Sequence, residues 1–466
     1  MKKFKVLLAC CLALFMLILA VCLSSNDSTS EPTQAIAPDI LYAQAVDPLR
    51  AAESLSYTIK STQTISLGNQ DFTYTSQQKL NIENPGLETM RSSMVETLDY
   101  GTFSVALTEY YENGSGYLEI GENAFTAPIT AEVFTQRYAP VVCIDPTLYQ
   151  EIQIVSIEDG IGINFSKPTG AEQWALPSGT VFTDASGYAV LDESGALRES
   201  VYTITYTAGT ATIAKRTEIV ISDQCQVLSP EEPNTYKPID CFDAPRMLEQ
   251  ACGYLVQAEN VKSSAETVID CQTFLIHRTQ KSDLTLRGSG EDFNALLDIQ
   301  INQINQSRGG EVTQFCQTEA FENGKYTISL NGDPATKNKA IDAAAMKEYC
   351  QDVLIGNILL PSHIFGATAE ETDTTMILTF HPSDALAEAI CSKICNTLYS
   401  DGELLHALSS DYSTQSTQYV LILDKYTGLL QSFSSQYSAS HTIESIVYQL
   451  ESKTEQTYQY TETSGQ

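Results

Sequence analysis

The chain has 466 residues, 43% of them hydrophobic, and a formal net charge of −32 at pH 7. This length exceeds what one hydrophobic core usually holds, and the apolar fraction excludes a disordered chain, so two globular domains are expected. A field this negative repels the phosphate backbone of DNA and RNA, which excludes nucleic acid as a partner.

The first 25 residues indicate a signal peptide or membrane anchor. A basic start, Met1 to Lys5, precedes an uncharged run from Val6 to Leu23, and polar residues follow at once. This order is typical of export, and the lysines place the N-terminus in the cytoplasm. We therefore expect the rest of the chain outside the cytoplasm, in a bacterial cell envelope, either membrane-anchored through this segment or secreted.

Cys22 is the candidate lipidation site. The sequence Leu19-Ala20-Val21-Cys22 lies at the right place, but Val21 stands where a small residue is expected. An uncleaved anchor and an ordinary cleaved signal therefore stay open beside a lipoprotein.

Composition divides the remaining chain. A stretch rich in Ser, Thr, Asn and Pro follows the signal, and a second break, SPEEPNTYKP, has three prolines in ten residues. The predicted segments are a flexible linker at 26–44, a first domain at 45–228, a Pro-rich linker at 229–242, a second domain at 243–460 and a tail at 461–466.

The two domains repeat one order of features, which predicts an internal duplication. Each opens with a helix start signal, Asp47-Pro48 in the first and Asp243-Ala244-Pro245 in the second. Alternating Thr, Ile, Tyr and Val then predict half-buried strands. These strands are 56–65 and 72–82 in the first domain, and 265–278 and 282–287 in the second.

A hairpin is predicted next in each domain. Asn113-Gly114 and Asn323-Gly324 each stand between an aromatic strand end and an aromatic strand start. Both residue types accept a positive φ, which a tight hairpin turn requires. Later elements also match in order: helices at 131–137 and 340–354, Pro-ended strands at 163–168 and 378–382, helices at 171–175 and 383–399, Asp-to-Gly turns at 192–195 and 424–428, and final strands at 201–206 and 442–450.

This order predicts an α+β fold with two tandem curved antiparallel sheets, or half-barrels, each with helices on one face. It resembles the LolA/LppX-like half-barrel family of envelope lipoproteins. The likeness rests on the hairpins Tyr111–Tyr117 and Phe321–Tyr326, the strand ends Phe165–Pro168 and Phe380–Pro382, and the two Asp-to-Gly turns. It covers about residues 45–225 and 243–460. The tandem arrangement and the imperfect lipidation motif depart from the best-known members.

The resemblance implies a sheet that cups an apolar cavity under helices, in a carrier or sensor of lipids and other apolar molecules. It implies no catalytic residues. From sequence alone, the many Tyr and Phe side chains fit core packing as well as a cavity lining.

Motifs for catalysis or metal binding are missing. The five histidines show no HxH, HxxxH or HExxH spacing, and neither GxSxG nor a phosphate loop occurs. Asp192 and Asp424 fit Asx-type turn caps better than calcium ligands, and Glu370 to Asp373 fit a solvated loop. Cys391 and Cys395, four apart on a predicted helix, fit a buried stripe. We predict no catalytic or metal residues and no cofactor, and the sequence does not identify ligand-binding residues.

The leading hypothesis is a non-enzymatic extracytoplasmic protein that binds an apolar or lipid-like ligand or senses the state of the envelope. The alternative is an envelope scaffold or protein-interaction module without a small-molecule ligand, and the sequence names no protein partner. An internal cavity would favour the first hypothesis. A buried cluster of titratable groups would instead favour a third, an enzyme with an unrecognised site.

Overall fold

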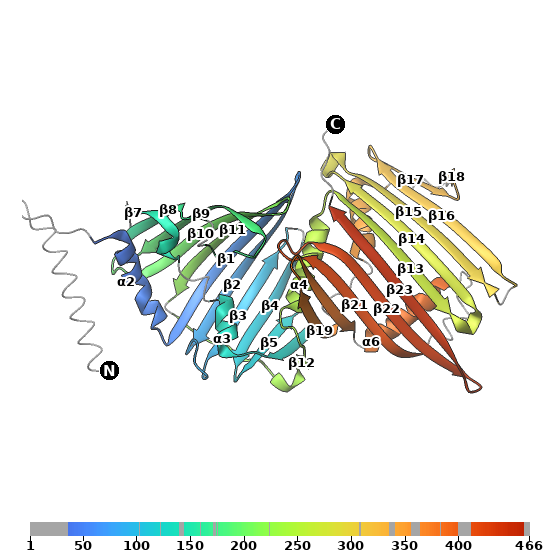
Figure 1. Ribbon diagram of the computed structural model, residues 1–466, viewed down its shortest axis with the longest axis horizontal. Helices are drawn as coiled ribbons and strands as arrows, with labels where there is room; N and C mark the ends of the chain where they lie inside the picture. Colours follow the sequence, from blue (N-terminus) through green and yellow to red (C-terminus); the bar gives the residue numbers. More distant parts are fainter. Residues whose placement is uncertain are drawn as a thin grey trace, which may run out of the picture.

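The computed structural model describes residues 36–460, with 102, 122, 139–143, 159, 171–173, 175, 223, 307–308, 335–340, 356–363, 383 and 399–411 excepted. The predicted signal or anchor with Cys22, most of the predicted helix 171–175 and the tail 461–466 lie outside the described residues. Two open, curved, largely antiparallel sheets lie side by side along the long axis of the molecule (Figure 1). The predicted α+β class with two half-barrels is thereby confirmed.

The first sheet has twelve strands among the described residues, in the order β12-β6-β5-β4-β3-β2-β1-β11-β10-β9-β8-β7. Their bounds are β1 Ser54–Leu67, β2 Gln70–Glu83, β3 Arg91–Asp99, β4 Ser104–Glu112, β5 Ser115–Ile120, β6 Asn123–Pro128, β7 Tyr149–Ile157, β8 Gly160–Pro168, β9 Thr180–Leu191, β10 Leu197–Ala208, β11 Ala211–Ser222 and β12 Lys237–Pro238.

The second sheet has eleven strands in the described part of the chain, in the order β18-β17-β16-β15-β14-β13-β23-β22-β21-β20-β19. Their bounds are β13 Val261–Cys271, β14 Ile276–Arg287, β15 Asn294–Asn305, β16 Glu311–Glu322, β17 Lys325–Leu330, β18 Asp333–Pro334, β19 Ile364–Glu371, β20 Thr375–Pro382, β21 Ser413–Asp424, β22 Leu430–Ile443 and β23 Ile446–Tyr460.

The two strand orders are the same order written twice. Strands β1 to β11 correspond one to one with β13 to β23, and in both sheets the last strand closes against the first. Only β12, which has no counterpart among the described residues of the second half, adds to the first sheet. The internal duplication predicted from the sequence is confirmed at the level of topology.

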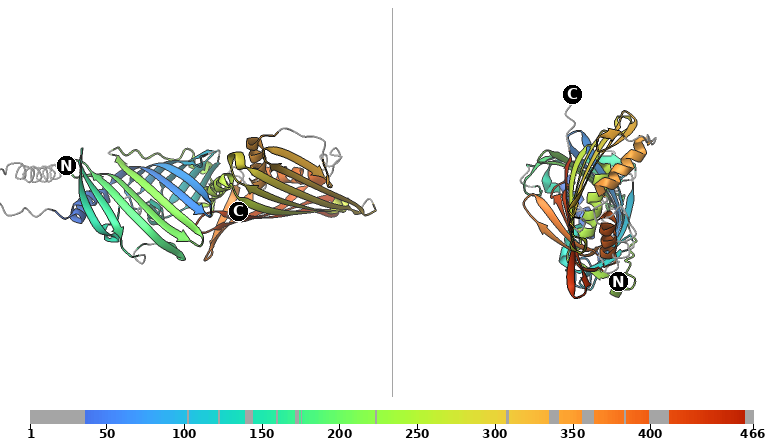
Figure 2. Two further views of the ribbon diagram at one scale, coloured as in Figure 1. Left: turned by 90° about the horizontal axis from the view of Figure 1, so that it is seen from above. Right: turned by 90° about the vertical axis from the view of Figure 1, so that its right-hand side faces the viewer.

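Helices cover one face of each sheet, which we call the inner face (Figure 2). Helix α2 (Pro38–Arg50) packs on β7 and β10, and α4 (Ala244–Gln257) contacts β2 of the first sheet and β22 of the second. Helix α3 (Ala131–Tyr138) places Phe134 against Tyr111 of β4. Helix α5 (Ala343–Ile355) packs on β14 and β15, and α6 (Asp384–Leu398) on β21.

Hairpins and turns lie where the sequence predicts them. Asn113-Gly114 joins β4 to β5 and Asn323-Gly324 joins β16 to β17, with all four residues at positive φ. The Asp-to-Gly turns join β9 to β10 and β21 to β22, and strands β8 and β20 end in proline. These predictions hold because each depends on a local backbone requirement that few residue types meet.

Four sequence predictions are wrong. The first helix does not start at Asp47-Pro48; it begins at Pro38, within the predicted linker 26–44, and Pro48 lies in its last turn. The predicted strand 265–278 is broken at residues 272–275, where Leu275 adopts a positive φ without any glycine signal. The predicted strand 442–450 is broken by a turn at Glu444 and Ser445. The predicted break between strands 265–278 and 282–287 does not exist, because β14 runs without interruption from Ile276 to Arg287.

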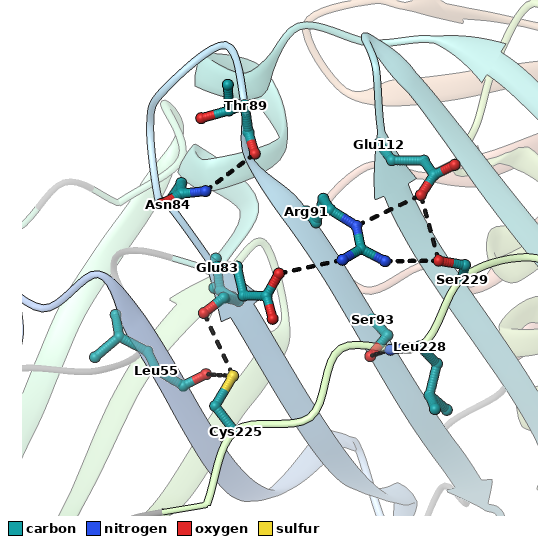
Figure 3. A network of polar contacts seen from close by, with 11 residues as sticks. Leu55, Glu83, Asn84, Thr89, Arg91, Ser93, Glu112, Cys225, Leu228 and Ser229 are labelled. Carbon is teal, nitrogen blue, oxygen red and sulfur yellow. Dashed lines mark hydrogen bonds and ion pairs between the residues drawn. The ribbon is translucent and has the colours of Figure 1, made fainter.

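The proline-rich connection lies packed against the first sheet. Figure 3 shows residues 225–229 crossing the strand ends, where Arg91 donates to Ser229 Oγ at 2.7 Å and Leu228 N donates to Ser93 Oγ at 3.0 Å. Further along, β12 pairs with β6, and Cys241 N donates to the Ala367 carbonyl of β19 at 3.1 Å. The connection therefore joins an edge of the first sheet to an edge of the second.

Candidate functional site

The inner face of the first sheet carries a polar band across its middle. Lys215 of β11 pairs with Gln63 of β1, and Gln63 pairs with Tyr74 of β2. One row along, Thr217, Ser61 and Ser76 stand side by side, and the Ser61 and Thr217 hydroxyls lie 3.2 Å apart. We call the residues of these two rows, Ser61, Gln63, Tyr74, Ser76, Lys215 and Thr217, the first polar band.

The second sheet repeats this band at the corresponding strands. Thr454 of β23 pairs with Thr267 of β13, and Thr267 pairs with Gln280 of β14. The two threonine hydroxyls lie 3.0 Å apart, which matches the Ser61–Thr217 contact of the first sheet. Arg278 stands in the next row and donates to Gln280 Oε1 at 3.1 Å. We call Thr267, Arg278, Gln280 and Thr454 the second polar band.

Apolar clusters lie on both sides of each band. In the first sheet, α2 buries Tyr42 and Val46 against Ile163 and Phe165, while Phe72, Leu80 and Leu107 pack into the central core toward α4. In the second sheet, α6 packs Cys391, Ile394 and Cys395 against Ile269 and Leu450. Each fully buried side chain of this size contributes about 1.5–3 kcal/mol. The inner faces are thus apolar at their ends and polar in their middle.

Each band holds one cation that is partly shielded from water. Burial lowers the pKa of Lys215 and of Arg278 below their ordinary values, because a charged form loses hydration inside the cup. Many other band residues, including Gln63, Tyr74, Thr267 and Gln280, are only partly buried, so the middle of each inner face stays accessible.

A pocket of about 250 Å³ lies at the junction of the two sheets. Gln63 and Tyr74 of the first polar band form one wall, and helix α4 contributes Met247 and Gln250. The opposite wall comes from the second sheet, with Met376, Leu423 and the turn 424–428. Sulfur-bearing and aromatic side chains beside amides suit a ligand that is partly apolar and partly polar.

Tyr426 holds the turn at this pocket against the first half of the chain. Its hydroxyl lies 2.6 Å from the Ser178 carbonyl oxygen and 3.0 Å from that of Asp373. On the first-sheet side of the pocket, Gln63 Nε2 donates to the Tyr254 hydroxyl at 3.3 Å, which holds β1 against helix α4. Both halves therefore build the pocket.

Two buried carboxylates of the first sheet meet Arg246 of helix α4. Glu96 and Glu109 are each 1% exposed, and Arg246 reaches Glu96 at 2.7 Å and also pairs with Glu109. Ser76 and Gln78 donate further hydrogen bonds to Glu96, at 2.5 and 2.8 Å. These contacts compensate the two negative charges. Without them, burying both carboxylates this deeply would cost too much free energy.

Glu319 is the counterpart of Glu109 in the second hairpin. It accepts from the Tyr326 hydroxyl at 2.6 Å and from Tyr349 at 3.1 Å. Burial, with Glu319 beside it, raises the pKa of Tyr349 to about 12, so this phenol stays a donor at neutral pH. Sequence reasoning missed the pair, although the repeated spacing Glu-x-aromatic-Glu-Asn-Gly at 109–114 and 319–324 was a usable signal.

The acidic residues singled out from the sequence cap turns or form ion pairs. Asp192 accepts from Ser194 N and Ala196 N at 2.9 and 3.0 Å, and Asp424 accepts from Tyr426 N and Thr427 N at 3.1 and 2.9 Å. Both are Asx-type turn caps, as predicted. Glu370 and Glu371 end strand β19 and do not lie in the predicted loop, and Glu371 pairs with Lys425 at 2.6 Å.

Cys391 and Cys395 lie buried on one face of α6, which confirms the predicted stripe. The eight cysteines of the described residues carry free thiols. Within the described residues, no group of His, Cys, Asp and Glu side chains could hold a metal ion. Across residues 36–460 as described, no helix is long and apolar enough to cross a membrane.

Comparisons with known proteins leave the family open. No protein-family model matches the chain, and no curated protein matches it. Among solved structures, LprF from Mycobacterium bovis has 8% identity over 42% of this chain and 96% of its own, with a TM-score of 0.26. A putative AttH from Nitrosomonas europaea has 6% identity over 92% of this chain and 99% of its own, with a TM-score of 0.16.

Kievitone hydratase from Nectria haematococca has 7% identity over 92% of this chain and 96% of its own, with a TM-score of 0.14. Because these TM-scores lie below 0.5, the likenesses carry no argument. The two open curved sheets agree with the architecture that the LolA/LppX-like resemblance implies, and membership in that family stays a prediction.

Proposed function

We propose that this chain is a non-enzymatic binding protein of the bacterial cell envelope, held outside the cytoplasm by its N-terminal segment, and that its half-barrels bind an apolar, lipid-like molecule with a polar end. The observation that carries the proposal is the polar band that crosses the middle of both inner faces. A sheet face that only closes a core against its own helices is normally apolar, because a buried polar group costs free energy.

The repetition of the band strengthens this proposal. Ser61–Thr217 and Thr267–Thr454 lie on corresponding strand pairs, β1 with β11 and β13 with β23, in sheets whose sequences have otherwise diverged. Apolar clusters at both ends with a polar, partly accessible middle offer an amphipathic ligand contacts of both kinds. A ligand in the junction pocket, whose volume is about 250 Å³, would contact both halves of the chain.

Native mass spectrometry of the full chain, purified from its own envelope, tests the proposal when combined with organic extraction of bound material. We expect an added mass that extraction releases as a lipid or another amphiphile. Ser61→Trp, which fills the first polar band, should reduce the bound mass. Thr58→Trp, on the outer face of the same strand, is the matched control and should retain it. A bare mass, together with no uptake of a fluorescent fatty acid or fatty alcohol, would contradict the proposal.

One observation favours the alternative, an envelope scaffold or protein-interaction module. Strand β7 forms an edge of the first sheet, and its Ile154 and Val155 are 46% and 38% exposed. An exposed apolar edge strand can pair with an extended segment of another protein. Under this alternative, Ile154→Lys would abolish capture of an envelope protein while lipid uptake would be absent from the outset.

A further inference from the structure

Lys215 lies on the inner face of the first sheet without a bonded partner for its ammonium group among the described residues. Its neighbours along β11 on the same face, Ile213 and Thr217, are buried. Across the strands it faces Gln63 of β1 and Ile204 of β10. Side chains alternate between the two faces along β11. Arg216 and Glu218 therefore lie on the outer face in water, whereas Lys215 points to the inner face.

The inner-face positions beside Lys215 on β1 and β10 carry neutral side chains and no carboxylate. Tyr202 and Tyr206 flank Ile204 on the next strand, and burial raises the pKa of both phenols, so they stay neutral donors at physiological pH. The Gln63 amide lies on the other side. The buried carboxylates on this face, Glu96 and Glu109, are both paired with Arg246. Lys215 is therefore an inward-facing cation among neutral neighbours in a chain of net charge −32.

An ammonium group that burial partly desolvates favours a nearby negative charge, because such a charge replaces part of the hydration that is lost. Perturbed charges in accessible concave sites are characteristic of functional positions. A negatively charged group bound beside Lys215 would compensate this loss through a charge-assisted hydrogen bond.

The row Lys215–Gln63–Tyr74 also connects this place to the junction pocket, because Gln63 and Tyr74 line that pocket. Two strand spacings of ~4.8 Å place Lys215 roughly 10 Å from Tyr74 along the row. An extended chain of about ten carbons starting at Lys215 would therefore pass Gln63 and reach Tyr74 at the wall of the pocket.

We propose that Lys215 binds the single negatively charged head group of an amphiphile, a carboxylate or a phosphate monoester, whose hydrocarbon chain runs along Gln63 and Tyr74 into the junction pocket. This inference rests on the proposed function and specifies its ligand: an anionic, single-headed amphiphile rather than a neutral lipid. The hydroxyls of Tyr202 and Tyr206 and the amide of Gln63 supply further donors to the same head group.

Competition binding to the full chain tests the assignment. The probe is a dansyl-labelled undecanoic acid, and the competitors are dodecanoic acid, dodecyl phosphate, dodecanol and inorganic phosphate. We expect each anionic amphiphile to displace the probe at about tenfold lower concentration than dodecanol, the effect of one charge-assisted hydrogen bond. Inorganic phosphate should not displace it at comparable concentration, since it has no chain for the pocket.

Variants locate the effect at Lys215. Lys215→Met should lower the affinity for dodecanoic acid about tenfold and leave that for dodecanol unchanged, whereas Lys215→Arg should keep the preference for the acid. Lys60→Met, which removes an exposed lysine from the outer face of neighbouring β1, is the matched control and should change neither affinity. Far-UV circular dichroism verifies that all variants are folded.

Three results would overturn the inference while leaving the proposed function standing: equal displacement by dodecanoic acid and dodecanol, an unchanged preference in Lys215→Met, or a loss in Lys215→Arg as large as in Lys215→Met. Displacement by inorganic phosphate as readily as by dodecyl phosphate would also overturn it, because the site would then bind a free anion. Failure of the wild-type chain to take up the probe or dodecanol would remove the proposed function itself.

Discussion

At the scale of single residues, turns are held by side-chain hydrogen bonds that could be predicted from the sequence. Burial alone would favour the protonated form of Asp192, but hydrogen bonds from Ser194, Ala196 and Arg198 hold its pKa at about 2. A carboxyl group with a depressed pKa in the folded state stabilises the fold at pH values above its ordinary pKa. That contribution is lost as the pH falls through the folded-state value.

Asp192→Asn should therefore lower the free energy of unfolding by about 0.5–1 kcal/mol at pH 7, a small amount because this turn is open to solvent. The gap between wild type and variant should narrow as the pH falls from about 4 to about 2, where the wild-type carboxylate becomes protonated. Urea unfolding across this range measures it. Asp71→Asn, at an exposed position of β2, is the control, and a gap that stays constant down to pH 2 would contradict the account.

Arg246 is the residue on which the buried carboxylates depend. Arg246→Met keeps much of the side-chain volume but leaves Glu96 and Glu109 without their cation, so we expect a loss of about 3–5 kcal/mol. Arg216→Met removes an exposed pair with Glu218 and should cost under about 1 kcal/mol. Chemical denaturation compares the two, and equal losses would show that the buried network is not what holds α4 on the first sheet.

At the scale of elements, hairpins and strand ends could be predicted because asparagine, glycine and proline mark them. Breaks without such residues could not be predicted. The strand predicted over 265–278 contains a turn that ends at Leu275, and leucine does not indicate the positive φ found there. The start of α2 was misplaced because Asp47-Pro48 mimics a helix start while lying in a last turn.

The sequence also assigned α4 to the second domain alone, but hydrogen bonds between distant segments join this helix to the first sheet as well. Gln257 accepts from Thr73 N at 2.8 Å and donates to the Tyr100 carbonyl at 2.8 Å. Gln70 accepts from Asn260 N and donates to the Asn260 carbonyl, both at 3.1 Å. Helix α4 is thus bonded to the first sheet along its last turn, which a pattern of local signals cannot reveal.

Gly253 permits this packing. A Cβ at this position would lie 2.4 Å from the Tyr100 ring, so Gly253→Ala must push the helix away from the first sheet. We expect a loss of about 1–3 kcal/mol, typical of overpacking, although alanine is the better helix former. Gly170→Ala, at an open position with ordinary φ, is the matched control. Thermal unfolding compares the two, and a variant at 253 as stable as the wild type would contradict this packing.

At the scale of the whole molecule, the duplication was visible in the sequence but the polar bands were not. Along β1, the inner residues Ser61 and Gln63 alternate with the outer residues Lys60 and Thr62. Both faces are polar there, so the sequence shows no alternation of polar and apolar residues at the position of the band. Only the register, which sets Ser61 beside Thr217 and Gln63 beside Lys215, assembles the band.

The junction pocket could not be predicted either, because its walls come from residues up to 365 positions apart, from Gln63 to Gly428. Packing between the halves creates it, through α4, the connection at Cys241 and the Tyr426 contact with Ser178. The molecule thus offers an inner surface that runs from the first band through the pocket toward the second sheet.

Photo-cross-linking of a diazirine-bearing dodecanoic acid to the full chain, with peptide mass spectrometry, tests this arrangement most directly. We predict labels that excess dodecanoic acid suppresses, located on inner-face positions of β1, β2, β10 and β11 near Lys215 and on Met247 of α4. Suppressible labels confined to outer-face positions such as Lys60 and Thr62, or no suppressible label at all, would contradict ligand binding within the half-barrels.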